Sequence, residues 1–224
     1  MTNENLYDVI IIGAGSLGTP TAFYLAQSGL KVLVLESVPS VGQGSNKRAI
    51  GGIRATHSDP AKIRLCLRSI EIFSTFKETY GDEIEWDQCG YAFVAYTPRE
   101  EKTLKDLLVV QKTFGLVNDW YDQQDFLKLV PDLSPEGLIG GTFSPNDGSA
   151  SPLLTNHAYY SHAVELGAKF RFSEPVTNME ISNGRITAIE TCSDRYSAAV
   201  VINTAGARAA SIGRLAGVAV DARR

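Results

Sequence analysis

A glycine-rich turn near the N-terminus constrains the fold of this chain more than any other stretch. Residues 9–12 form a short apolar run, typical of a strand buried on both faces, which leads directly into Gly13-Ala-Gly-Ser-Leu-Gly18. In this G-x-G-x-x-G pattern Gly13 permits the tight turn out of the strand, Gly15 lets backbone N–H groups approach a pyrophosphate, and Gly18 lets the next helix pack closely on the sheet. The partial positive charge at the start of that helix favours an anion. The turn therefore predicts a site for the phosphates of a nucleotide.

The residues after the turn complete a strand–helix–strand unit. Residues 17–27 are predicted as the helix and residues 31–35 as a second buried strand, which ends at Glu36. Glu36 lies about 20 residues beyond the glycines, where an acidic side chain accepts hydrogen bonds from the hydroxyls of an adenosine ribose. An ordinary turn with an incidental acidic residue is the alternative, and the complete unit disfavours it. Glu36 also argues against NADP, because a carboxylate repels a 2′-phosphate and no arginine directly follows it.

The composition is that of an ordinary globular protein. The chain has 224 residues, of which 44% are hydrophobic and 21% charged, so it is long enough for one large domain or two small ones. A net charge of −4 and the lack of a dense basic run argue against a nucleic-acid partner. The cysteines Cys66, Cys89 and Cys192 form no C-x-x-C pair and show no ligand spacing, so neither a disulfide framework nor a metal site is expected.

The N-terminal residues and the apolar segments bear on location. Residues 1–5 are polar and acidic, and the apolar run after them is too short for a signal peptide. No segment approaches the ~20 apolar residues that a membrane span needs. We therefore expect no membrane span and a cytoplasmic location.

A long glycine- and serine-rich segment, residues 37–58, follows the second strand. A loop of this length without regular structure usually carries function. It is either laid against a flat cofactor, with small residues where the backbone passes close, or it is a mobile surface linker. The first interpretation is favoured because the loop leaves the carboxyl edge of the second strand, beside the nucleotide crevice.

The rest of the chain alternates helices and strands, with a change of character after Glu85. Asp59 and Pro60 predict the start of an amphipathic helix that continues to about residue 80. Residues 97–100 read as a capping box that opens a helix ending near residue 113. Further elements are predicted at 89–96 (strand), 124–130 (helix), 137–143 (strand), 151–166 (helix), 169–172 (strand), 176–182 and 185–191 (a hairpin around Asn183-Gly184) and 198–203 (strand). The segment after Glu85 does not continue the nucleotide-binding pattern and is predicted to be an inserted second domain.

Several separated stretches agree on one family. They occur in the order Gly13-Ala-Gly-Ser-Leu-Gly18 with Glu36, Gly51-Gly-Ile-Arg54, Cys89-Gly-Tyr-Ala-Phe93, Asp147-Gly148 before Ser151-Pro152, and Val201-Ile-Asn-Thr-Ala-Gly206. Together they resemble the FAD-dependent D-amino-acid oxidase superfamily, and within it the group of the sarcosine oxidase β subunit and glycine oxidase. The likeness covers nearly the whole chain.

The resemblance implies an α/β fold, with a Rossmann-like FAD-binding domain interrupted by an α+β substrate domain. The FAD-binding domain is expected at residues 1–82 and 146–217, and the first part of the substrate domain at 83–145 and 218–224. Both domains are expected to be incomplete, because members of the superfamily continue beyond the point that corresponds to Arg224. Unpaired sheet edges would then favour a complementing subunit or a homo-oligomer.

The same resemblance implies a set of cofactor contacts. They are Gly13, Gly15, Ser16, Leu17, Gly18, Glu36, Ser37, Ser45, Asn46, Lys47, Arg48, Gly51, Gly52, Val176, Ala205 and Gly206. The glycine turn would hold the pyrophosphate, Glu36 the ribose, and residues 45–48 the diphosphate and the flavin side. Val176 matches a position whose backbone touches the adenine, although its side chain also fits a plain core role. Arg48 stands where some relatives tether their flavin through a histidine, so the FAD is expected to be non-covalent.

Arg54 and His57 are the candidate substrate contacts. Arg54 matches the arginine that anchors the substrate carboxylate in sarcosine-oxidase-like enzymes, a task that suits a guanidinium fork. The alternative is an arginine that pairs only with protein groups. His57 could face the same cavity, although a lone histidine before a helix more often has a structural role. His157 and His162 are assigned to packing or to the surface, and no catalytic acid or base is nominated.

The chemistry implied by the resemblance is oxidation of a C–N bond by hydride transfer to flavin. The substrate would be a small amino acid or secondary amine of the sarcosine, glycine or proline kind, and the electron acceptor oxygen or an electron-transfer partner. Two alternatives stay open: an FAD-dependent 2-hydroxy-acid oxidase, since Arg54 would hold that carboxylate equally well, and an inactive truncated chain or flavin-binding subunit that needs a partner chain. An NAD-dependent dehydrogenase is less favoured, because the 51–54 loop suits a flavin better.

Overall fold

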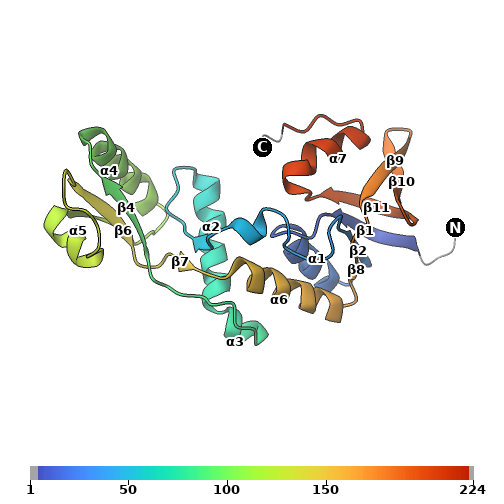
Figure 1. The fold of residues 1–224 in the computed structure, drawn as a ribbon, viewed down its shortest axis with the longest axis horizontal. Coiled ribbons are helices and arrows are strands. Elements are labelled where there is room, and N and C mark those ends of the chain that lie inside the picture. Colours follow the sequence, from blue (N-terminus) through green and yellow to red (C-terminus); the bar gives the residue numbers. More distant parts are fainter. Residues whose placement is uncertain (1–4, 222–224) are drawn as a thin grey trace. The chain divides into compact units, whose positions relative to one another are not determined.

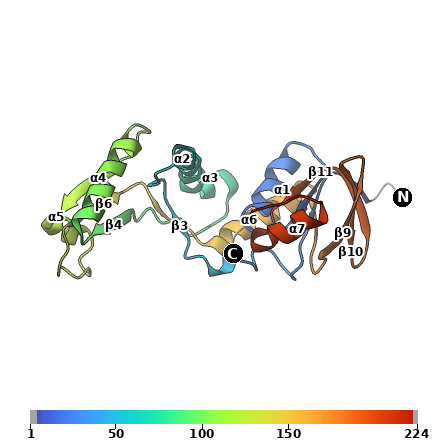
Figure 2. The same cartoon turned by 90° about the horizontal axis from the view of Figure 1, so that it is seen from above.

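The computed structural model describes residues 5–221 and divides the chain into two compact units (Figures 1 and 2). Unit 1 comprises Met1–Ile50 and Pro152–Arg224, and unit 2 comprises Gly51–Ser151. The segments 51–82 and 146–151, expected in the FAD-binding domain, thus pack with unit 2. The assignment of a cofactor and a substrate role to the two parts stays a prediction. Residues 222–224 of the expected substrate-domain segment and residues 1–4 of the polar start lie outside the described residues.

Unit 1 is built on a six-stranded sheet with the order β8-β2-β1-β11-β10-β9. The strands are β1 (Leu6–Ile12), β2 (Val32–Leu35), β8 (Lys169–Arg171), β9 (Val176–Ser182), β10 (Arg185–Thr191) and β11 (Arg195–Asn203). β8, β2, β1 and β11 are parallel, whereas β10 and β9 continue the sheet antiparallel. The pairing sets Ile10 of β1 between Leu33 of β2 and Val201 of β11. The apolar runs predicted as buried strands are therefore the centre of the sheet.

Helices cover the parallel strands of unit 1. α1 (Gly18–Gln27) and α6 (Pro152–Glu165) pack against each other, with the rings of Phe23 and Tyr159 5.5 Å apart. Alternate strand residues such as Ile10 and Leu33 form an apolar cluster, against which Ile212 of α7 (Ala209–Leu215) packs. The sheet is thus apolar on both faces, which explains why its parallel strands read as continuous hydrophobic runs.

Unit 2 combines a three-stranded antiparallel sheet with helices. The sheet has the order β4-β6-β5, made of β4 (Tyr91–Ala95), β5 (Asp119–Asp122) and β6 (Gly140–Ser144). Figure 2 shows α4 (Pro98–Lys112) lying over this sheet, which α5 (Gln123–Leu129) also contacts. The remaining elements are α2 (Pro60–Ser74), α3 (Phe76–Tyr80) and the short antiparallel pair β3 (Gly52–Ile53) and β7 (Gly148–Ser149).

Most predicted elements are present, with shifts at their ends. Asp59 caps α2 as predicted, and Thr97 with Glu100 forms the predicted capping box of α4. The helix expected up to residue 80 breaks at Thr75, which starts the separate helix α3. β5 and α7 were not predicted, because β5 is a four-residue strand with aspartate at both ends, and α7 is a seven-residue helix with no clear apolar period.

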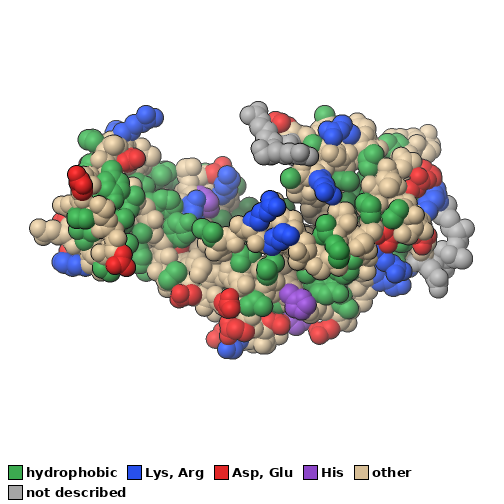
Figure 3. Space-filling view, viewed as in Figure 1, with side chains coloured by type: hydrophobic (Ala, Val, Ile, Leu, Met, Phe, Trp, Pro, Cys, Tyr) green, Lys and Arg blue, Asp and Glu red, His purple; other side chains and the backbone are tan. Residues whose placement is uncertain are grey.

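The surface carries charged and apolar side chains together. On the face drawn in Figure 3, basic and acidic side chains are interspersed over both units. Some apolar side chains are strongly exposed, such as Leu17 (70%) and Ile50 (92%) in unit 1. Among residues 5–221, no helix is long and apolar enough to cross a membrane, and no cluster of His, Cys, Asp and Glu could hold a metal ion. A cytoplasmic location and an oligomer or complementing subunit stay predictions.

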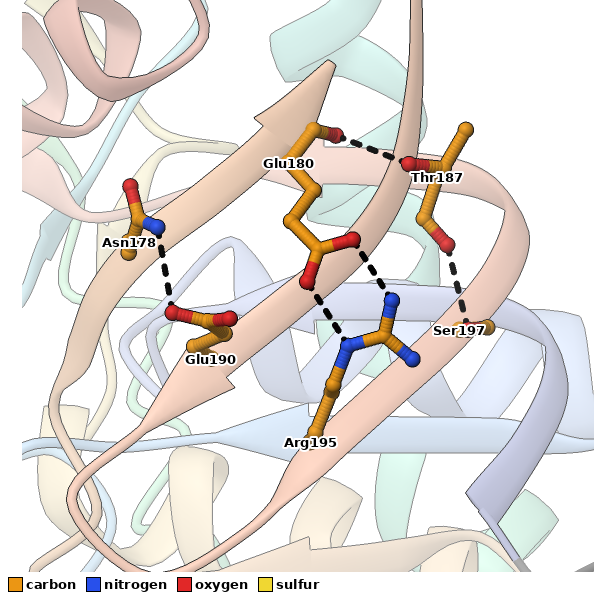
Figure 4. Close-up of polar contacts among 6 residues, drawn as sticks. All are labelled: Asn178, Glu180, Thr187, Glu190, Arg195 and Ser197. Atoms are coloured by element: carbon orange, nitrogen blue, oxygen red, sulfur yellow. Dashed lines mark hydrogen bonds and ion pairs between the residues drawn. The ribbon is translucent and has the colours of Figure 1, made fainter. Parts of the chain in front are cut away.

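The hairpin of β9 and β10 is held to β11 by a polar network on its outer face (Figure 4). Arg195 of β11 donates from Nε and Nη2 to the two carboxylate oxygens of Glu180 at 2.8 and 2.6 Å, and this pairing lowers the pKa of Glu180. Ser197 donates to the main-chain oxygen of Thr187 on β10. The predicted turn at Asn183-Gly184 is confirmed, with φ of 52° and 74°. These cross-strand contacts support the register in which β11 joins the hairpin to the parallel strands.

Candidate functional site

Unit 1 contains a pocket of about 570 Å³ at the carboxyl ends of β1 and β2. Four loops line it: the glycine turn after β1, the loop after β2, the segment between β8 and β9, and the turn after β11. It brings together most of the predicted cofactor contacts, namely Gly13, Gly15, Ser16, Leu17, Glu36, Ser37, Ser45, Asn46, Val176, Ala205 and Gly206. The carboxyl edge of a parallel sheet is where open α/β folds bind ligands.

The three glycines of the turn are required for different reasons. Gly13 has φ of +109°, and a Cβ there would lie 2.6 Å from the main-chain oxygen of Thr204. A Cβ at Gly18 would lie 1.8 Å from the main-chain oxygen of Gly13, so α1 can start this close to the strand only with glycine. A Cβ at Gly15 would meet no protein atom within 4 Å, although Gly15 lines the pocket. Gly15 therefore borders open space in the pocket, as the predicted approach of a phosphate to the turn requires.

The N-terminus of α1 supplies the charge that such a ligand needs. No side chain caps α1, and its first turn contains no acidic residue. The helices α2 and α4, by contrast, are capped by Asp59 and Thr97. Within α1, the N–H of Thr19 donates to the main-chain oxygen of Gly15 at 3.1 Å and Pro20 has no N–H, so an anion at this helix start would be met by the N–H groups of residues 16–18, where Ser16 and Leu17 line the pocket. These features fit the diphosphate of a dinucleotide.

Glu36 links the glycine turn to the loop after β2. Its Oε2 accepts from the N–H of Ala14 at 2.7 Å, and its Oε1 accepts from the N–H of Val38 at 3.1 Å and from Ser37 Oγ at 3.2 Å. A carboxylate has about four acceptor positions, so one remains for a ribose hydroxyl. Glu36 thus orders the turn itself, a role that its spacing from the glycines did not predict.

The pocket also includes residues that sequence reasoning missed. Arg208, in the turn after β11, donates from Nη1 to Ser37 Oγ at 3.2 Å, next to Glu36. The buried carboxylate of Glu174 accepts from Tyr196 Oη at 2.8 Å, and the pKa of Tyr196 is raised by burial first and by this bond second. No local signal marks Arg208, because its partner lies 171 residues earlier in the chain. An arginine therefore does contact Ser37, which donates to Glu36, although no arginine directly follows Glu36 in sequence.

Other predicted cofactor contacts lie outside this pocket. Gly18 supports it through the packing of α1, and Lys47 and Arg48 are exposed on the short helix η2 (Asn46–Arg48). Gly51 and Gly52 belong to unit 2. Cofactor contacts by these residues stay predictions.

In unit 2, the guanidinium of Arg54 lies against two aromatic rings. β3 pairs with β7 and ends just before Arg54, whose Cζ is 5.6 Å from the ring centroid of Tyr91 and 5.1 Å from that of Phe93. Its Nη1 donates to the main-chain oxygen of Thr56. Within residues 5–221, Arg54 forms no ion pair with a carboxylate. The remaining N–H groups are therefore available to an anionic ligand.

Asp147 holds the segment after Arg54 in place. It is 1% exposed, and its two oxygens accept from the N–H of Ala55 at 2.9 Å and from Thr56 Oγ1 at 3.2 Å. Burial raises the pKa of Asp147, although these hydrogen bonds and Arg54 oppose the shift. The structure thus shows a physical role for the Asp147-Gly148 motif.

A cavity of about 230 Å³ lies next to Arg54. It is lined by Arg54, Thr56, His57, Ser58, Phe93, Leu104, Leu107, Gln111, Asn118 and Thr142. His57 thus faces the same cavity as Arg54. Burial and the positive charges of Arg54 and Lys62 lower the pKa of His57, so its imidazole is neutral at neutral pH. The other two histidines lie in α6. The ring centroids of His157 and Tyr160 are 5.9 Å apart, and Nδ1 of His162 lies 3.2 Å from Oε2 of Glu165.

Comparisons with known proteins agree with the motifs. The family model described as "FAD dependent oxidoreductase" (DAO) matches residues 8–224. Mitochondrial sarcosine dehydrogenase of Mus musculus is 26% identical over 95% of this chain, and glycine oxidase of Geobacillus kaustophilus is 26% identical over 96%. Among solved structures, L-proline dehydrogenase from P. horikoshii matches with a TM-score of 0.89 and 31% identity over 94% of this chain. The predicted α/β fold with a Rossmann-like core is thereby confirmed.

The matched proteins are longer than this chain. It spans 24% of the mouse sarcosine dehydrogenase, 58% of the glycine oxidase and 56% of the proline dehydrogenase. These likenesses therefore show the fold and the family of this chain. They do not show the activity of a whole protein.

Proposed function

Because this chain belongs to the FAD dependent oxidoreductase (DAO) family, we propose that unit 1 binds FAD and that the protein oxidises the C–N bond of a small amino acid or secondary amine. The observation that carries the substrate class is Arg54, a half-buried guanidinium at the edge of a small cavity, which forms no ion pair among the described residues although its charge acts on the buried Asp147. A carboxylate-bearing ligand would complete that site.

The cofactor side is supported by the pocket of unit 1. The uncapped start of α1 and the space at Gly15 would receive the diphosphate, and the remaining acceptor position of Glu36 would receive a ribose hydroxyl. The backbone at Val176 would border the adenine, and the turn at Ala205 and Gly206 would border the rest of the cofactor. We infer that binding is non-covalent, since Arg48 stands at the tethering position of some relatives.

The substrate side is supported by the cavity of unit 2. Arg54 would hold the carboxylate through two parallel hydrogen bonds, and Asp147 would keep the Arg54 segment in position. The neutral imidazole of His57 adds no positive charge that would repel an amine. The names of the three matched proteins specify sarcosine, glycine and proline, which share a carboxylate and a small amine, and this supports the substrate class.

Bound FAD would supply the chemistry by accepting hydride from the carbon next to the amine, which leaves an imine that water hydrolyses. The residues of this chain would orient the substrate and exclude water from it. Either oxygen or an electron-transfer partner could then take the electrons, since the matched proteins include an oxidase and two dehydrogenases. A 2-hydroxy acid would fit Arg54 as well, and release of ammonia or an amine from glycine or sarcosine would distinguish the two reactions.

The test is to load the purified chain with FAD, desalt it, and record the visible spectrum before and after anaerobic addition of sarcosine, glycine, proline or lactate. We expect a retained flavin spectrum that an amino acid bleaches and lactate does not. Arg54→Leu is expected to keep the flavin and to raise the amino acid concentration for half-bleaching at least about tenfold, since a hydrogen bond to a charged group is lost. Arg68→Leu, at an exposed arginine of the same unit, serves as the control.

A colourless chain that cannot be loaded would contradict FAD binding by this chain alone and would favour a subunit that needs a partner. A flavin that lactate bleaches while amino acids do not would favour the 2-hydroxy-acid alternative. Equal effects of Arg54→Leu and Arg68→Leu would remove Arg54 from the substrate site.

A further inference from the structure

One residue that lines the cavity beside Arg54, Asn118, carries a buried acceptor without a hydrogen-bond partner. Asn118 is 2% exposed and lines the cavity, and its Oδ1 has no hydrogen-bond partner. Within residues 5–221 it is the one buried side-chain nitrogen or oxygen atom in this state. Buried polar atoms in folded proteins are nearly always paired, and an unpaired acceptor costs folding free energy. This oxygen therefore calls for a donor from outside the chain.

The orientation of Asn118 is set by a chain of amides. Its Nδ2 donates to Gln111 Oε1 at 2.7 Å, and Gln111 Nε2 donates to the main-chain oxygen of His57 at 3.1 Å. A main-chain oxygen can only accept, so the amide of Gln111 is fixed, and with it the amide of Asn118. Gln111, itself buried in α4, is thus a positioning residue that leaves Oδ1 of Asn118 as the free atom.

The lining of the cavity combines apolar and polar side chains. Phe93, Leu104 and Leu107 carry no polar side-chain atoms, whereas Thr56, Ser58 and Thr142 carry hydroxyls. A volume of about 230 Å³ has room for on the order of eight water-sized groups, which suits a small amino acid. The neutral imidazole of His57 leaves Arg54 as the cationic group of the cavity lining.

We propose that Asn118 Oδ1 accepts a hydrogen bond from the amine of a ligand whose carboxylate is held by Arg54. The cavity then selects compounds that carry both groups over carboxylic acids of the same shape that lack the amine. This inference rests on the proposed function, because it takes the cavity beside Arg54 as the amino-acid site. An ammonium donor makes a charge-assisted bond, which is stronger than the bond of a neutral donor.

The experiment compares paired ligands by calorimetry on the FAD-loaded chain under anaerobic conditions. The pairs are proline with cyclopentanecarboxylate and sarcosine with butanoate. In the wild type we expect the amino acid to bind about tenfold more tightly than its partner that lacks the amine, as one charge-assisted hydrogen bond implies. In Asn118→Leu we expect this ratio to fall to about one, with binding of the plain acid unchanged.

Further variants keep the test decisive if Asn118→Leu does not fold. Gln111→Leu combined with Asn118→Leu removes both amides together, which leaves no new unpaired group between them, and is expected to show the same loss of preference. Asn178→Leu, an exposed asparagine of unit 1, is the control and should keep the wild-type ratio.

The outcomes separate the two proposals. If both ligands of a pair bind, Arg54→Leu weakens both, and Asn118→Leu leaves their ratio unchanged, the role of Asn118 is overturned while the proposed function stands. The same holds if the wild type binds both ligands of a pair equally. If neither ligand binds, or if binding does not depend on Arg54, the proposed function fails, and the inference fails with it.

Discussion

At the scale of single residues, the same residue type serves two different purposes in the pocket of unit 1. Gly13 and Gly18 are glycine because protein atoms occupy the position of a Cβ, whereas Gly15 borders open space. Glu36 similarly combines two tasks, since it binds the N–H groups of Ala14 and Val38 and keeps one acceptor position free. Single residues thus divide into those that build the pocket and those that leave room for its ligand.

This division predicts that an added methyl group weakens FAD binding at one glycine and lowers protein stability at another. Gly15→Ala should raise the dissociation constant for FAD by about tenfold, or ~1.4 kcal/mol, without changing the thermal stability of the FAD-free chain. Gly18→Ala should instead lower the stability by about 1–3 kcal/mol, because its Cβ would overlap the oxygen of Gly13. Flavin fluorescence titration and thermal unfolding measure the two effects. Equal destabilisation by both variants would show that Gly15 serves protein packing.

At the scale of elements, the position of Arg54, the candidate substrate contact, depends on hydrogen bonds between two segments next to the ends of separate strands. Asp147, between β6 and β7, accepts hydrogen bonds from Ala55 and Thr56, which follow β3. The pairing of β3 with β7 brings these segments together. The position of Arg54 therefore depends on a buried carboxylate more than ninety residues away in sequence.

The raised pKa of Asp147 predicts a pH-dependent contribution to stability. Because its folded pKa lies above the ordinary 3.8, the folded chain binds a proton at pH values where the unfolded chain has released it. Its contribution is fully present below pH 3.8 and is lost as the pH rises through the folded pKa. Relative to Asp147→Asn, which does not titrate there, the wild type should therefore lose stability over this window. Urea unfolding from below pH 3.8 to neutral measures the difference.

An exposed aspartate of the same unit provides the comparison. Asp132→Asn removes an exposed carboxylate from the same unit and is the matched control for loss of a charge. If the difference in the free energy of unfolding between the wild type and Asp147→Asn stays constant across the same pH range, burial does not raise the pKa of Asp147.

At the scale of the whole molecule, the two units hold different halves of the proposed chemistry. Unit 1 contains the pocket proposed to bind the nucleotide, and unit 2 contains the Arg54 cavity. The chain spans between 24% and 58% of the matched relatives and exposes apolar side chains such as Leu17 and Ile50. Because the two sites lie in different units, FAD binding by the pocket of unit 1 can be measured separately from turnover of an amino acid.

We expect FAD to stabilise the chain and to be released by acid. A ligand at one hundred times its dissociation constant adds about 2.7 kcal/mol to the free energy of unfolding, so FAD should raise the melting temperature. ADP should do the same, whereas FMN should do less, because the residues that line the pocket of unit 1 are those proposed to contact the adenosine diphosphate half of FAD. Acid precipitation should leave all the flavin in the supernatant. A yellow pellet would contradict non-covalent binding.

Local patterns in the sequence determined the elements that depend on neighbouring residues. The glycine turn with its strand and helix, the capping box of Thr97 and the Asn183-Gly184 hairpin all follow from backbone preferences within a few positions, and the structure confirms each of them. The combination of separated motifs was enough to indicate the family, because each motif keeps its own local geometry.

The tertiary structure alone decided which distant side chains meet. The contact of Arg208 with Ser37, the hold of Asp147 on the Arg54 segment and the amide chain from His57 to Asn118 join residues whose separation carries no periodic or turn signal. Short elements such as β5 and α7 were also missed, because their few residues set no clear period. Local propensity acts over a turn of chain, whereas these contacts arise from strand order and packing, which bring ends of separate elements to one place.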